Sequence, residues 1–386
     1  MAGPLDGVRV LDLSHVLNGP FATMLLGHLG ADVIKVEYGA GDRYRHSWLP
    51  PGVHHDSYEF LAVNANKRAI TLNLKSERGK ALFRELAAKS DVLVENFSVG
   101  VLDRLGLGYE ALREINPGLI YASSRGFGDW GPYAQARAFA PTIMAAAGWT
   151  ASAWELAGTP GTRTLGIGDE AAGVSMALGI CAALYARQAS GTGQRIEVSM
   201  QEALLGFMVS TLHTHFEGRS VGGICHPCAD GYVSFHLPDL SDEVWATMAT
   251  ALGHPEALAD PRFAGQKARR QHFDELQNEI LGWLTTRTRA ELWDLFRANH
   301  IPAAPVLTIA EVVDDEHLRA RQAFAGVPHD EAGELTLLRP WVRFSETPGE
   351  IRHAGPRIGE HNQEVYSELL GLTDDQLGEL AREGVI

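Results

Sequence analysis

The first 125 residues alternate between short β-branched runs and longer apolar or amphipathic segments, and this alternation constrains the fold more than any other feature. A run at residues 8–13 precedes turn chemistry at Asn18-Gly19-Pro20, an apolar segment at 21–29 and a second run at 32–36. Proline near the start of the apolar segment and glycine just past its end are typical of a helix. The pattern recurs, with strand-like runs at residues 69–74, 91–95 and 119–123. Strands that alternate with helices predict a parallel sheet covered on both faces, the doubly wound α/β class.

The composition changes after Gly126, where alanine and glycine become frequent. Residues 170–187 predict one long helix with closely packed small side chains, and a strand at 195–200 and a helix at 201–216 follow. Glycines and a Cys/His cluster at residues 217–230 indicate a linker into a smaller unit. That unit is predicted to hold a strand at 232–236 and helices near 242–252, 272–285 and 289–299.

The charge of the chain is unevenly distributed. Its 33 basic and 48 acidic side chains give a formal net charge of −15, which disfavours binding to a polyanion such as DNA or RNA. Residues 1–137 hold 15 basic and 15 acidic side chains, whereas residues 138–386 hold 18 and 33. Five of the six lysines also lie in the first quarter of the chain. A site for an anionic small molecule is therefore expected in the N-terminal third.

Cysteine usage and hydropathy predict a soluble, cytoplasmic protein. Three cysteines are too few for a disulfide framework in a chain of this length, which indicates a reducing compartment. The N-terminus lacks the basic and apolar regions of a signal peptide. The longest apolar stretch, at residues 176–186, is shorter than the roughly 20 residues that span a bilayer.

The first βα turn, residues 14–20, is where a doubly wound protein would bind a phosphate, because strand ends and helix N–H groups meet there. Its sequence, SHVLNGP, is neither a G-x-G-x-x-G fingerprint nor a P-loop, so a dinucleotide cofactor is disfavoured. Taken alone, the turn is more readily interpreted as a structural connection than as a ligand site.

Cys225-His226-Pro227-Cys228, with His213 and His215 upstream, has the residue types of a zinc or redox site. A lone C-x-x-C without a second pair is a weak signal, and the strand-to-helix position of a redox motif is missing. The preferred interpretation is a cysteine-containing linker, and no metal site is predicted.

Asp169 follows Gly166-Ile167-Gly168 at the start of the predicted long helix. Glycines allow close backbone approach, the helix N-terminus stabilises a carboxylate, and the apolar surroundings desolvate it. An aspartate in this position is also a common helix cap without further function. These features alone favour the cap over a catalytic role.

Several segments together resemble the class III CoA-transferases, also called the CaiB/BaiF family. The resemblance covers nearly the whole chain in the family's order, through residues 5–13, 27–37, 66–68 (NKR), 91–97 (DVLVENF), 126–128 (GFG), 131–133 (GPY), 191–194 (GTGQ) and 359–361 (GEH). It implies two Rossmann-like halves and a homodimer whose chains interlock like rings. It also implies a large CoA-binding domain at residues 1–216, completed by 330–386, and a small α/β domain with its linkers at 217–329.

The resemblance assigns the catalytic carboxylate to Asp169 and so reverses the preference for a cap. It implies that this carboxylate attacks an acyl-CoA, and that a mixed anhydride and then an aspartyl-CoA thioester form before an incoming acid collects the CoA. Such intermediates need an environment that excludes water and N–H donors for the oxyanions. The backbone near Gly166, Gly168 and Gly222-Gly223 is the candidate source of those donors.

For CoA, which acts as a substrate and not as a tightly bound cofactor, the resemblance implies ten contact residues. They are His15, Val16, Leu17, Tyr38, Leu72, Lys75, Asn96, Phe97, Arg104 and Arg137. The three cations among them suit the pyrophosphate and the 3′-phosphate, and the apolar side chains suit the adenine. Tyr38 occupies the position where family members often have an arginine near the adenine. The resemblance therefore implies that Tyr38 stacks on the adenine in place of the arginine contact.

Two other functions were weighed against transfer. Racemases of 2-methylacyl-CoA share the fold but carry a His-Asp pair after Gly-Pro-Tyr, where this chain has Arg137-Ala138-Phe139-Ala140-Pro141. Without that histidine, removal and return of an α-proton lacks one of its bases. A non-catalytic CoA-binding subunit of a hetero-oligomer is the second alternative, and the presence of Asp169 argues against it.

The acid substrates are not specified by the sequence. Arg125 lies in a Ser-Ser-Arg-Gly-Phe-Gly context where small or apolar residues are more usual, and His46, His54 and His55 are other basic candidates. We expect Arg125 to bind a second carboxylate if the substrate is a dicarboxylic acid.

Overall fold

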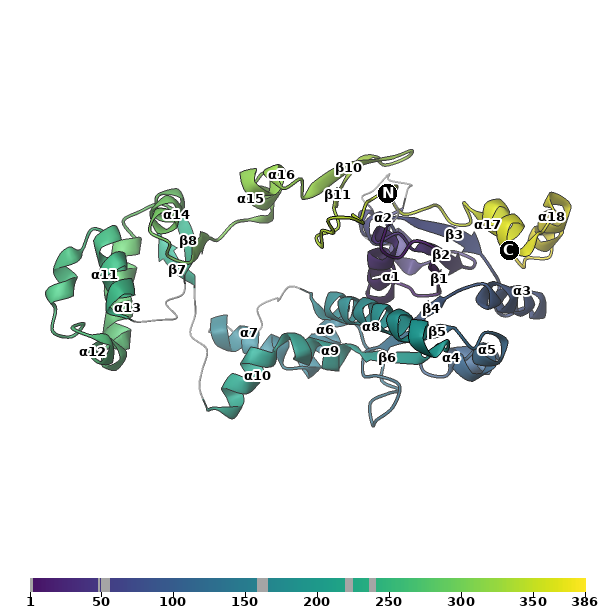
Figure 1. Cartoon of the computed structure of the whole chain (residues 1–386), viewed down its shortest axis with the longest axis horizontal. Coiled ribbons are helices and arrows are strands. Elements are labelled where there is room, and N and C mark those ends of the chain that lie inside the picture. The colour runs from purple at the N-terminus through teal and green to yellow at the C-terminus, as the bar shows by residue number, and fades with distance from the viewer. Residues whose placement is uncertain (1–2, 48, 50–55, 158–165, 219–224, 236–240) are drawn as a thin grey trace. The chain divides into compact units, whose positions relative to one another are not determined.

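The structure is a computed structural model that describes residues 3–47, 49, 56–157, 166–218, 225–235 and 241–386 (Figure 1). The chain forms two compact units. One comprises Met1–Gly218 together with Ala320–Ile386, and the other comprises Arg219–Arg319.

A parallel sheet of six strands organises the large unit, as the alternating pattern predicts. Its order is β3-β2-β1-β4-β5-β6. The strands are β1 (Arg9–Asp12), β2 (Asp32–Glu37), β3 (Lys67–Thr71), β4 (Val92–Glu95), β5 (Ile120–Arg125) and β6 (Arg195–Ser199). The order reverses between β1 and β4, and in doubly wound sheets ligands bind at the carboxyl ends of the strands at such a point.

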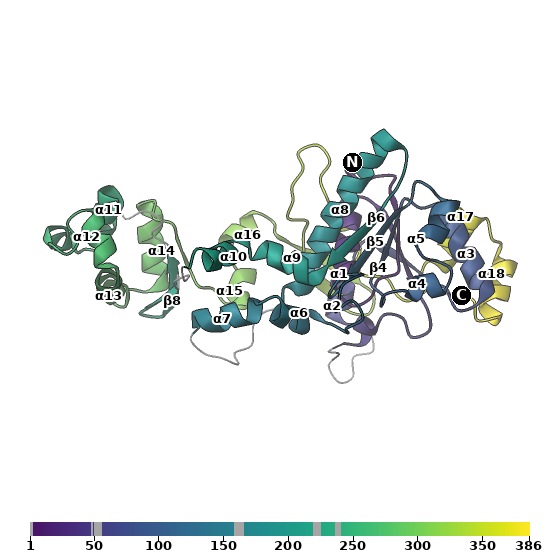
Figure 2. The same ribbon diagram turned by 90° about the horizontal axis from the view of Figure 1, so that it is seen from below.

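Helices cover both faces of this sheet (Figure 2). On one face lie α1 (Asn18–His28) and α8 (Gly168–Ser190), and on the other lie α3 (Glu77–Ala88), α4 (Val101–Arg104), α5 (Tyr109–Ile115), α17 (Asn362–Leu370) and α18 (Asp374–Arg382). Alternate residues of each strand enter the two cores, because strand side chains alternate between faces. Val10, Val33 and Val92 pack with α1 and α8. Leu11 and Ile34 pack with the other group.

The C-terminal segment returns to the sheet and completes its second core. The Tyr366 hydroxyl of α17 donates to the Thr71 carbonyl over 2.7 Å. The hairpin β10 (Phe324–His329) and β11 (Gly333–Leu338) packs with α2 (Tyr58–Val63). The remaining elements of this unit are η1 (Arg43–His46), α6 (Ala140–Ala146), α7 (Trp149–Ala157), α9 (Met200–Phe207) and α10 (Val209–Phe216).

The small unit combines a three-stranded antiparallel sheet with helices around its own core of Trp245, Phe263, Trp283 and Phe296. The sheet consists of β7 (Cys225–Cys228), β8 (Gly231–Phe235) and β9 (Ala303–Pro305). The helices are α11 (Asp242–Ala251), η2 (Pro255–Ala259), α12 (Gln266–Gln271), α13 (Phe273–Leu284), α14 (Arg289–Ala298), α15 (Ile309–Val313) and, at the boundary, α16 (Glu316–Ala320).

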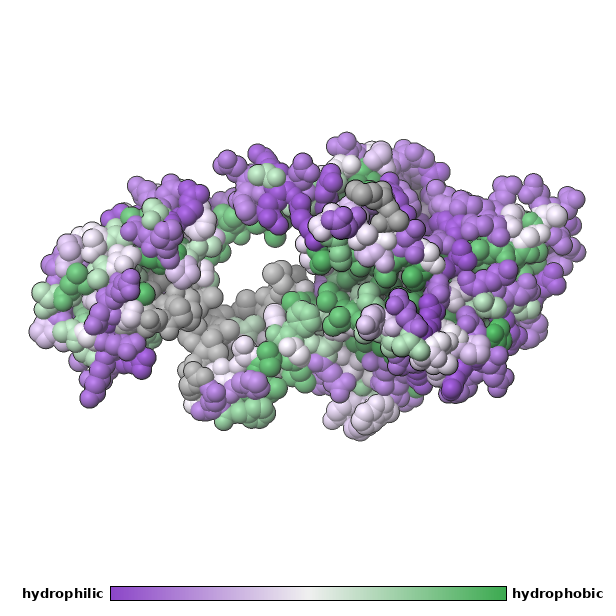
Figure 3. Space-filling view, in the orientation of Figure 1, coloured by the Kyte–Doolittle hydropathy of each residue, from purple (hydrophilic) through white to green (hydrophobic). Residues whose placement is uncertain are grey.

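The long helix α8 has one buried and one exposed apolar side. Met176 and Ile180 pack into the core with α1 and the sheet. Leu178 and Tyr185 are 70% and 78% exposed, and apolar side chains gather on the face of the large unit near α8 and α9 in Figure 3. Among the described residues, α8 alone is long and apolar enough to cross a membrane. Its packing against the sheet is typical of the core helix of a globular protein.

Candidate functional site

The site begins where the turns after β1 and β4 meet at the reversal of strand order. Asn96 links the two turns: its Oδ1 accepts from the His15 N–H over 2.9 Å, and its Nδ2 donates to the His15 carbonyl over 2.7 Å. Nδ2 also lies 3.0 Å from Asn18 Oδ1 at the start of α1. The rings of His15 and Phe97 are 5.5 Å apart. Hydrogen bonds of Asn96 therefore join the two turns into one continuous surface.

Asp169 lies in the first turn of α8, beside the N-terminus of α1. The helices approach so closely at Gly173 that a Cβ there would lie 2.8 Å from the Asn18 carbonyl oxygen, so only glycine fits. The Asn18 backbone N–H donates to the Asp169 carboxylate. Residues about 150 positions apart in sequence thus bring Asp169 to the turn after β1.

The surroundings of Asp169 make it a poorly solvated carboxylate. Its side chain is half-buried. Burial and the adjacent Glu170 raise the pKa of Asp169 to about 6, and the hydrogen bond from Asn18 opposes that rise. At neutral pH the group is still ionised. A desolvated, ionised carboxylate has the properties of a nucleophile.

A network of buried charges lies beneath the turn after β1. The Lys35 Nζ donates to the Ser14 carbonyl over 2.9 Å and to Asp42 Oδ2 over 3.1 Å. Burial alone would raise the pKa of Asp42, but the nearby His15 imidazole and the charge of Lys35 lower it overall. The Lys67 Nζ lies 2.9 Å from Asp12 Oδ2, and both side chains are fully buried. These lysines are bound to the protein's own carboxylates.

All ten predicted CoA contacts follow the carboxyl ends of strands β1 to β5. His15, Val16 and Leu17 are half-buried and Tyr38 is 49% exposed. Leu72 differs, because it is 1% exposed and its side chain packs in the core. Only the backbone of Leu72 is therefore placed to line a ligand, which corrects the expectation of a side-chain contact.

The three predicted phosphate-binding cations are exposed. Lys75 follows β3, Arg104 ends α4 and Arg137 lies in the loop after β5. In the part of the chain that the structure describes, no ion pair engages any of them. Each cation is therefore available to a ligand phosphate.

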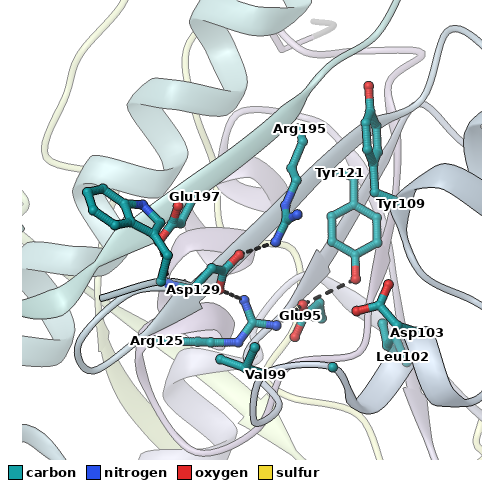
Figure 4. A pocket seen from close by; sticks show the side chains of 12 residues that line it. Glu95, Val99, Leu102, Asp103, Tyr109, Tyr121, Arg125, Asp129, Arg195 and Glu197 are labelled. Atoms are coloured by element: carbon teal, nitrogen blue, oxygen red, sulfur yellow. Dashed lines mark hydrogen bonds and ion pairs between the residues drawn. The ribbon is translucent and has the colours of Figure 1, made fainter. Parts of the chain in front are cut away.

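Arg125 is bound within the protein instead (Figure 4). Its Nε donates to the Phe97 carbonyl over 2.8 Å, its Nη2 lies 2.5 Å from Glu95 Oε1, and its Nη1 pairs with Asp129. This corrects the expectation that Arg125 binds a substrate carboxylate, because its guanidinium nitrogens already have partners. The sequence does not reveal Glu95 as a partner, since it comes from β4, whereas Asp129 is only four residues beyond Arg125.

Arg125 and Glu95 line a polar cavity of about 470 Å³, and both also bind the backbone of Phe97. Glu95 Oε2 accepts from the Phe97 N–H over 2.8 Å, so one buried and one half-buried charged side chain fix both backbone groups of Phe97. Figure 4 shows Arg195 reaching Asp129 from β6 on the same face of the sheet. The arrangement positions a predicted CoA contact.

The other candidates are placed as follows. His46 is exposed on η1, Gly166 is exposed and Gly168 is buried in the first turn of α8. His54, His55, Gly222 and Gly223 lie outside the described residues. Cys225 and Cys228 are three positions apart on β7, where such residues point to opposite faces, so their thiols do not converge. No group of three or more metal-ligating side chains occurs among the residues that are described.

Sequence reasoning missed Asp42, Lys35 and Glu37. A signal for them was present, because charged residues occur inside the otherwise apolar strand 32–37 (DVIKVE). A charge in a buried strand requires a partner of opposite sign. Asp42, five residues beyond Glu37, was the available carboxylate.

Comparisons with known proteins show the family to which the chain belongs. Residues 5–362 match CoA-transferase family III. The chain is 37% identical to a formyl-CoA:oxalate CoA-transferase of Streptomyces coelicolor over 100% of both chains. It is 37% identical to a succinyl-CoA–D-citramalate CoA-transferase of Chloroflexus aurantiacus over 99% of this chain and 98% of the relative. The crystal structure of a CaiB/BaiF family protein from Brucella suis matches with a TM-score of 0.83 and 31% identity, over 96% of this chain and 100% of that one.

Proposed function

We propose that this chain, which belongs to CoA-transferase family III and is a CoA-transferase, uses Asp169 to move CoA from an acyl-CoA donor to a carboxylic acid. The position of Asp169 carries the proposal. It is a half-buried carboxylate with a pKa raised to about 6, hydrogen-bonded by Asn18 at the turn after β1. The resemblance to CoA-transferases that the motifs indicated is confirmed by the family match.

The proposed reaction has four steps, each a displacement at a carbonyl carbon. The Asp169 carboxylate attacks the donor thioester, and the C–S bond breaks to give a mixed anhydride and CoA thiolate. The thiolate attacks the aspartyl carbonyl and releases the donor acid, which leaves an aspartyl-CoA thioester. The acceptor carboxylate then attacks this thioester and releases the thiolate. The thiolate finally attacks the acceptor carbonyl, which yields the new acyl-CoA and regenerates the Asp169 carboxylate.

Each step passes through a tetrahedral oxyanion, which backbone N–H donors would stabilise. The first turn of α8, around Gly166 and Gly168, supplies unpaired N–H groups of a helix N-terminus. We assign the oxyanion contacts to this turn. The half-buried position of Asp169 would limit access of water to the two anhydrides.

We assign CoA to the surface formed by the turns after β1 and β4. Lys75, Arg104 and Arg137 would pair with its phosphates, and Tyr38 would stack on the adenine. His15, Val16, Leu17, Asn96 and Phe97 would line the chain that leads to the thiol. Leu72 would contribute only backbone atoms.

The relatives suggest a class of substrate. Their names pair formyl-CoA with oxalate and succinyl-CoA with D-citramalate or L-malate. We propose that at least one partner acid of this enzyme is likewise a dicarboxylic acid. A screen of formyl-, succinyl- and acetyl-CoA against mono- and dicarboxylic acids tests this, and equal kcat/KM for the two acid classes would contradict it.

We further propose a cytoplasmic homodimer with interlocked chains. The exposed apolar side of α8, with Val174, Leu178 and Tyr185, is a surface that a second copy would cover. Within each chain we propose linkers between the large and small domains near residues 218 and 320, where the two compact units divide, so the boundary expected at 329 moves to before β10. Sedimentation would give a mass of about 84 kDa, twice the 41.9 kDa of the chain, and a concentration-independent monomer would contradict the dimer.

Trapping the intermediate tests the proposed function. The enzyme is incubated with acyl-CoA and hydroxylamine, and Asp169 is examined by peptide mass spectrometry. A hydroxamate at Asp169 with loss of activity supports the aspartyl intermediates. The matched variant Asp169→Asn should show neither the hydroxamate nor activity. An unmodified Asp169 in an active enzyme would overturn the proposal, and exchange of the α-proton with D₂O in the absence of an acceptor acid would favour a racemase.

A further inference from the structure

The turn after β1 contains a residue in a strained conformation. Val16 has a φ of +68°. A β-branched residue rarely adopts this left-handed region, and such conformations persist only where the surrounding structure enforces them. Val16 is also one of the residues assigned to CoA. The groups that hold Val16 in this conformation therefore also shape the proposed CoA-binding surface.

Asp42 is the group that holds Val16. Both of its carboxylate oxygens lie 3.0 Å from the Val16 nitrogen, and the side chain is fully buried. A buried charge-assisted hydrogen bond of this kind is stronger than one between neutral groups. The bond compensates for the strain at Val16.

Asp42 is in turn fixed by three groups: Lys35, Glu37 and the Tyr44 N–H, which donates to its Oδ1 over 3.0 Å. Lys35 Nζ lies 3.1 Å from its Oδ2, and the Asp42 N–H donates to Glu37 Oε1 over 2.9 Å. Arg45 holds Glu37 through its Nε over 2.9 Å and reaches Asp56 with its Nη1. The carboxylate of Asp42 thus has one defined position in the fold.

The same carboxylate faces His15. Its Oδ1 lies 3.8 Å from His15 Nδ1, on the side of the ring away from Nε2. At this distance the carboxylate attracts a proton on Nδ1 through space, which favours that tautomer and a ring orientation with Nδ1 toward Asp42. Nε2 is then the nitrogen left for a ligand.

We propose that Asp42 is a positioning residue for the CoA-binding turn, which holds Val16 in its left-handed conformation and orients His15. The turn is then formed before CoA arrives, and binding does not have to order it. This inference rests on the proposed function, because that proposal assigns the turn to CoA.

Titration calorimetry with CoA itself tests the proposal on the full-length enzyme. Asp42→Asn should weaken CoA binding about tenfold, since a neutral amide replaces the charged acceptor of the Val16 N–H. The matched control is Asp56→Asn, which removes a carboxylate at the outer end of the same network without touching the turn. Its CoA affinity should stay within about twofold of that of the wild type. Equal weakening by the two variants would overturn the proposal.

A second variant separates positioning from general loss of stability. Asp42→Asn leaves Lys35 buried without a countercharge, so the Tm also falls. In Lys35→Met/Asp42→Asn the orphaned charge is removed, and the Tm should recover while CoA binding stays about tenfold weakened. Recovery of both would show that Asp42 acts only on stability.

A double-mutant cycle tests the contact with Val16. Glycine adopts a φ of +68° without strain, so in a Val16→Gly background Asp42→Asn should weaken CoA binding by only about threefold or less. An undiminished tenfold effect would overturn the role assigned to the strain. Wild-type enzyme that fails to bind CoA would instead overturn the proposed function, and wild-type binding that Asp42→Asn leaves unchanged would overturn this inference alone.

Discussion

The cations near the carboxyl edge of the sheet fall into two groups with opposite environments. Lys35 and Lys67 extend from strands, are fully buried and face Asp42 and Asp12. Lys75, Arg104 and Arg137 lie beyond strand or helix ends and are exposed, and the described residues offer them no ion pair. Each of these five cations counts equally toward the basic character of residues 1–137.

The difference shows that position within an element decides what a cation does. Burying a charge is costly unless a partner of opposite sign is buried with it, so strand lysines are committed to the protein's own carboxylates. Loop cations retain their water and can exchange it for a ligand phosphate. A count of lysines therefore overstates how many of them are available to bind an anion.

The largest expected effect is on the free energy of unfolding, when the buried ion pair of Lys67 and Asp12 is broken. Lys67 donates to Asp12 Oδ2, to the Pro20 carbonyl and to Asn64 Oδ1 over 2.8 to 3.0 Å. Lys67→Met leaves Asp12 buried without a countercharge and should lower the free energy of unfolding by about 3–5 kcal/mol, measured by urea denaturation. Lys80→Met, which removes a half-buried cation of α3 whose partner Glu77 is exposed, should cost less than about 1 kcal/mol. Similar losses of unfolding free energy for Lys67→Met and Lys80→Met would show that the fully buried and the half-buried cation do not differ in their contribution to stability.

The exposed group should show the reverse behaviour. Arg104→Ala and Arg137→Ala should each weaken CoA binding about tenfold, because one charge-assisted contact to a phosphate is lost. The Tm should stay within about 2 °C of the wild-type value. Arg113→Ala on α5 removes another exposed arginine and should change neither quantity. A large fall in Tm with unchanged CoA affinity would mean that these cations are structural.

Asp169 is half-buried and so lies between the two groups of charges. The pH dependence of the reaction should report the ionisation of its carboxylate. The proposed nucleophile is the ionised form of Asp169, whose pKa is raised to about 6. We expect kcat/KM to fall about tenfold per pH unit below pH 6 and to be level above about pH 7. Glu170→Gln removes the like charge beside Asp169 and should move the midpoint to lower pH. A profile that is flat from pH 5 to 8 would contradict this role.

The smallest expected effect is the contribution of Asp169 to stability. Its pKa is higher in the folded protein than the usual 3.8, so the folded state binds the proton more tightly. Stability from this group is present below about pH 4 and is lost as the pH rises through about 6. Because the side chain is half-buried, Asp169→Asn should stabilise the protein by only about 1 kcal/mol at pH 8. Thermal unfolding at pH 8 and pH 4 measures this, and an equal gain at both would contradict it.

The sequence predicted the sheet well because its signals are local. Strand-like runs, a proline and a glycine fix the first βα unit, and repetition of that unit requires a parallel sheet. Asp169 could be found only through the resemblance, since a helix cap has the same local sequence. Its approach to Asn18 depends on the packing of α1 against α8 at Gly173, which no local pattern encodes.

The wrong expectations concern partners from other elements. Arg125 looked available because its carboxylates come from β4 and from the loop after β5. Leu72 looked available because a strand of alternating residues does not reveal which face is covered. Asp42 was missed because its function depends on contacts with Lys35 and with the turn after β1. Each error is one of tertiary contact, not of residue chemistry.

Helix α8 runs along the sheet from the carboxyl ends of its strands to their amino ends. Asp169 stands at its first turn, and near its last turn Arg187 binds Asp91 and the Gly118 carbonyl at the opposite edge. With 23 residues the helix is about 34 Å long, and it behaves as a stiff rod. A tilt of two degrees about the Arg187 end would displace the Asp169 carboxylate by roughly 1 Å, enough to spoil an attack geometry. The position of the proposed nucleophile Asp169 therefore depends on the contacts of Arg187 at the amino ends of β4 and β5, at the other end of the helix.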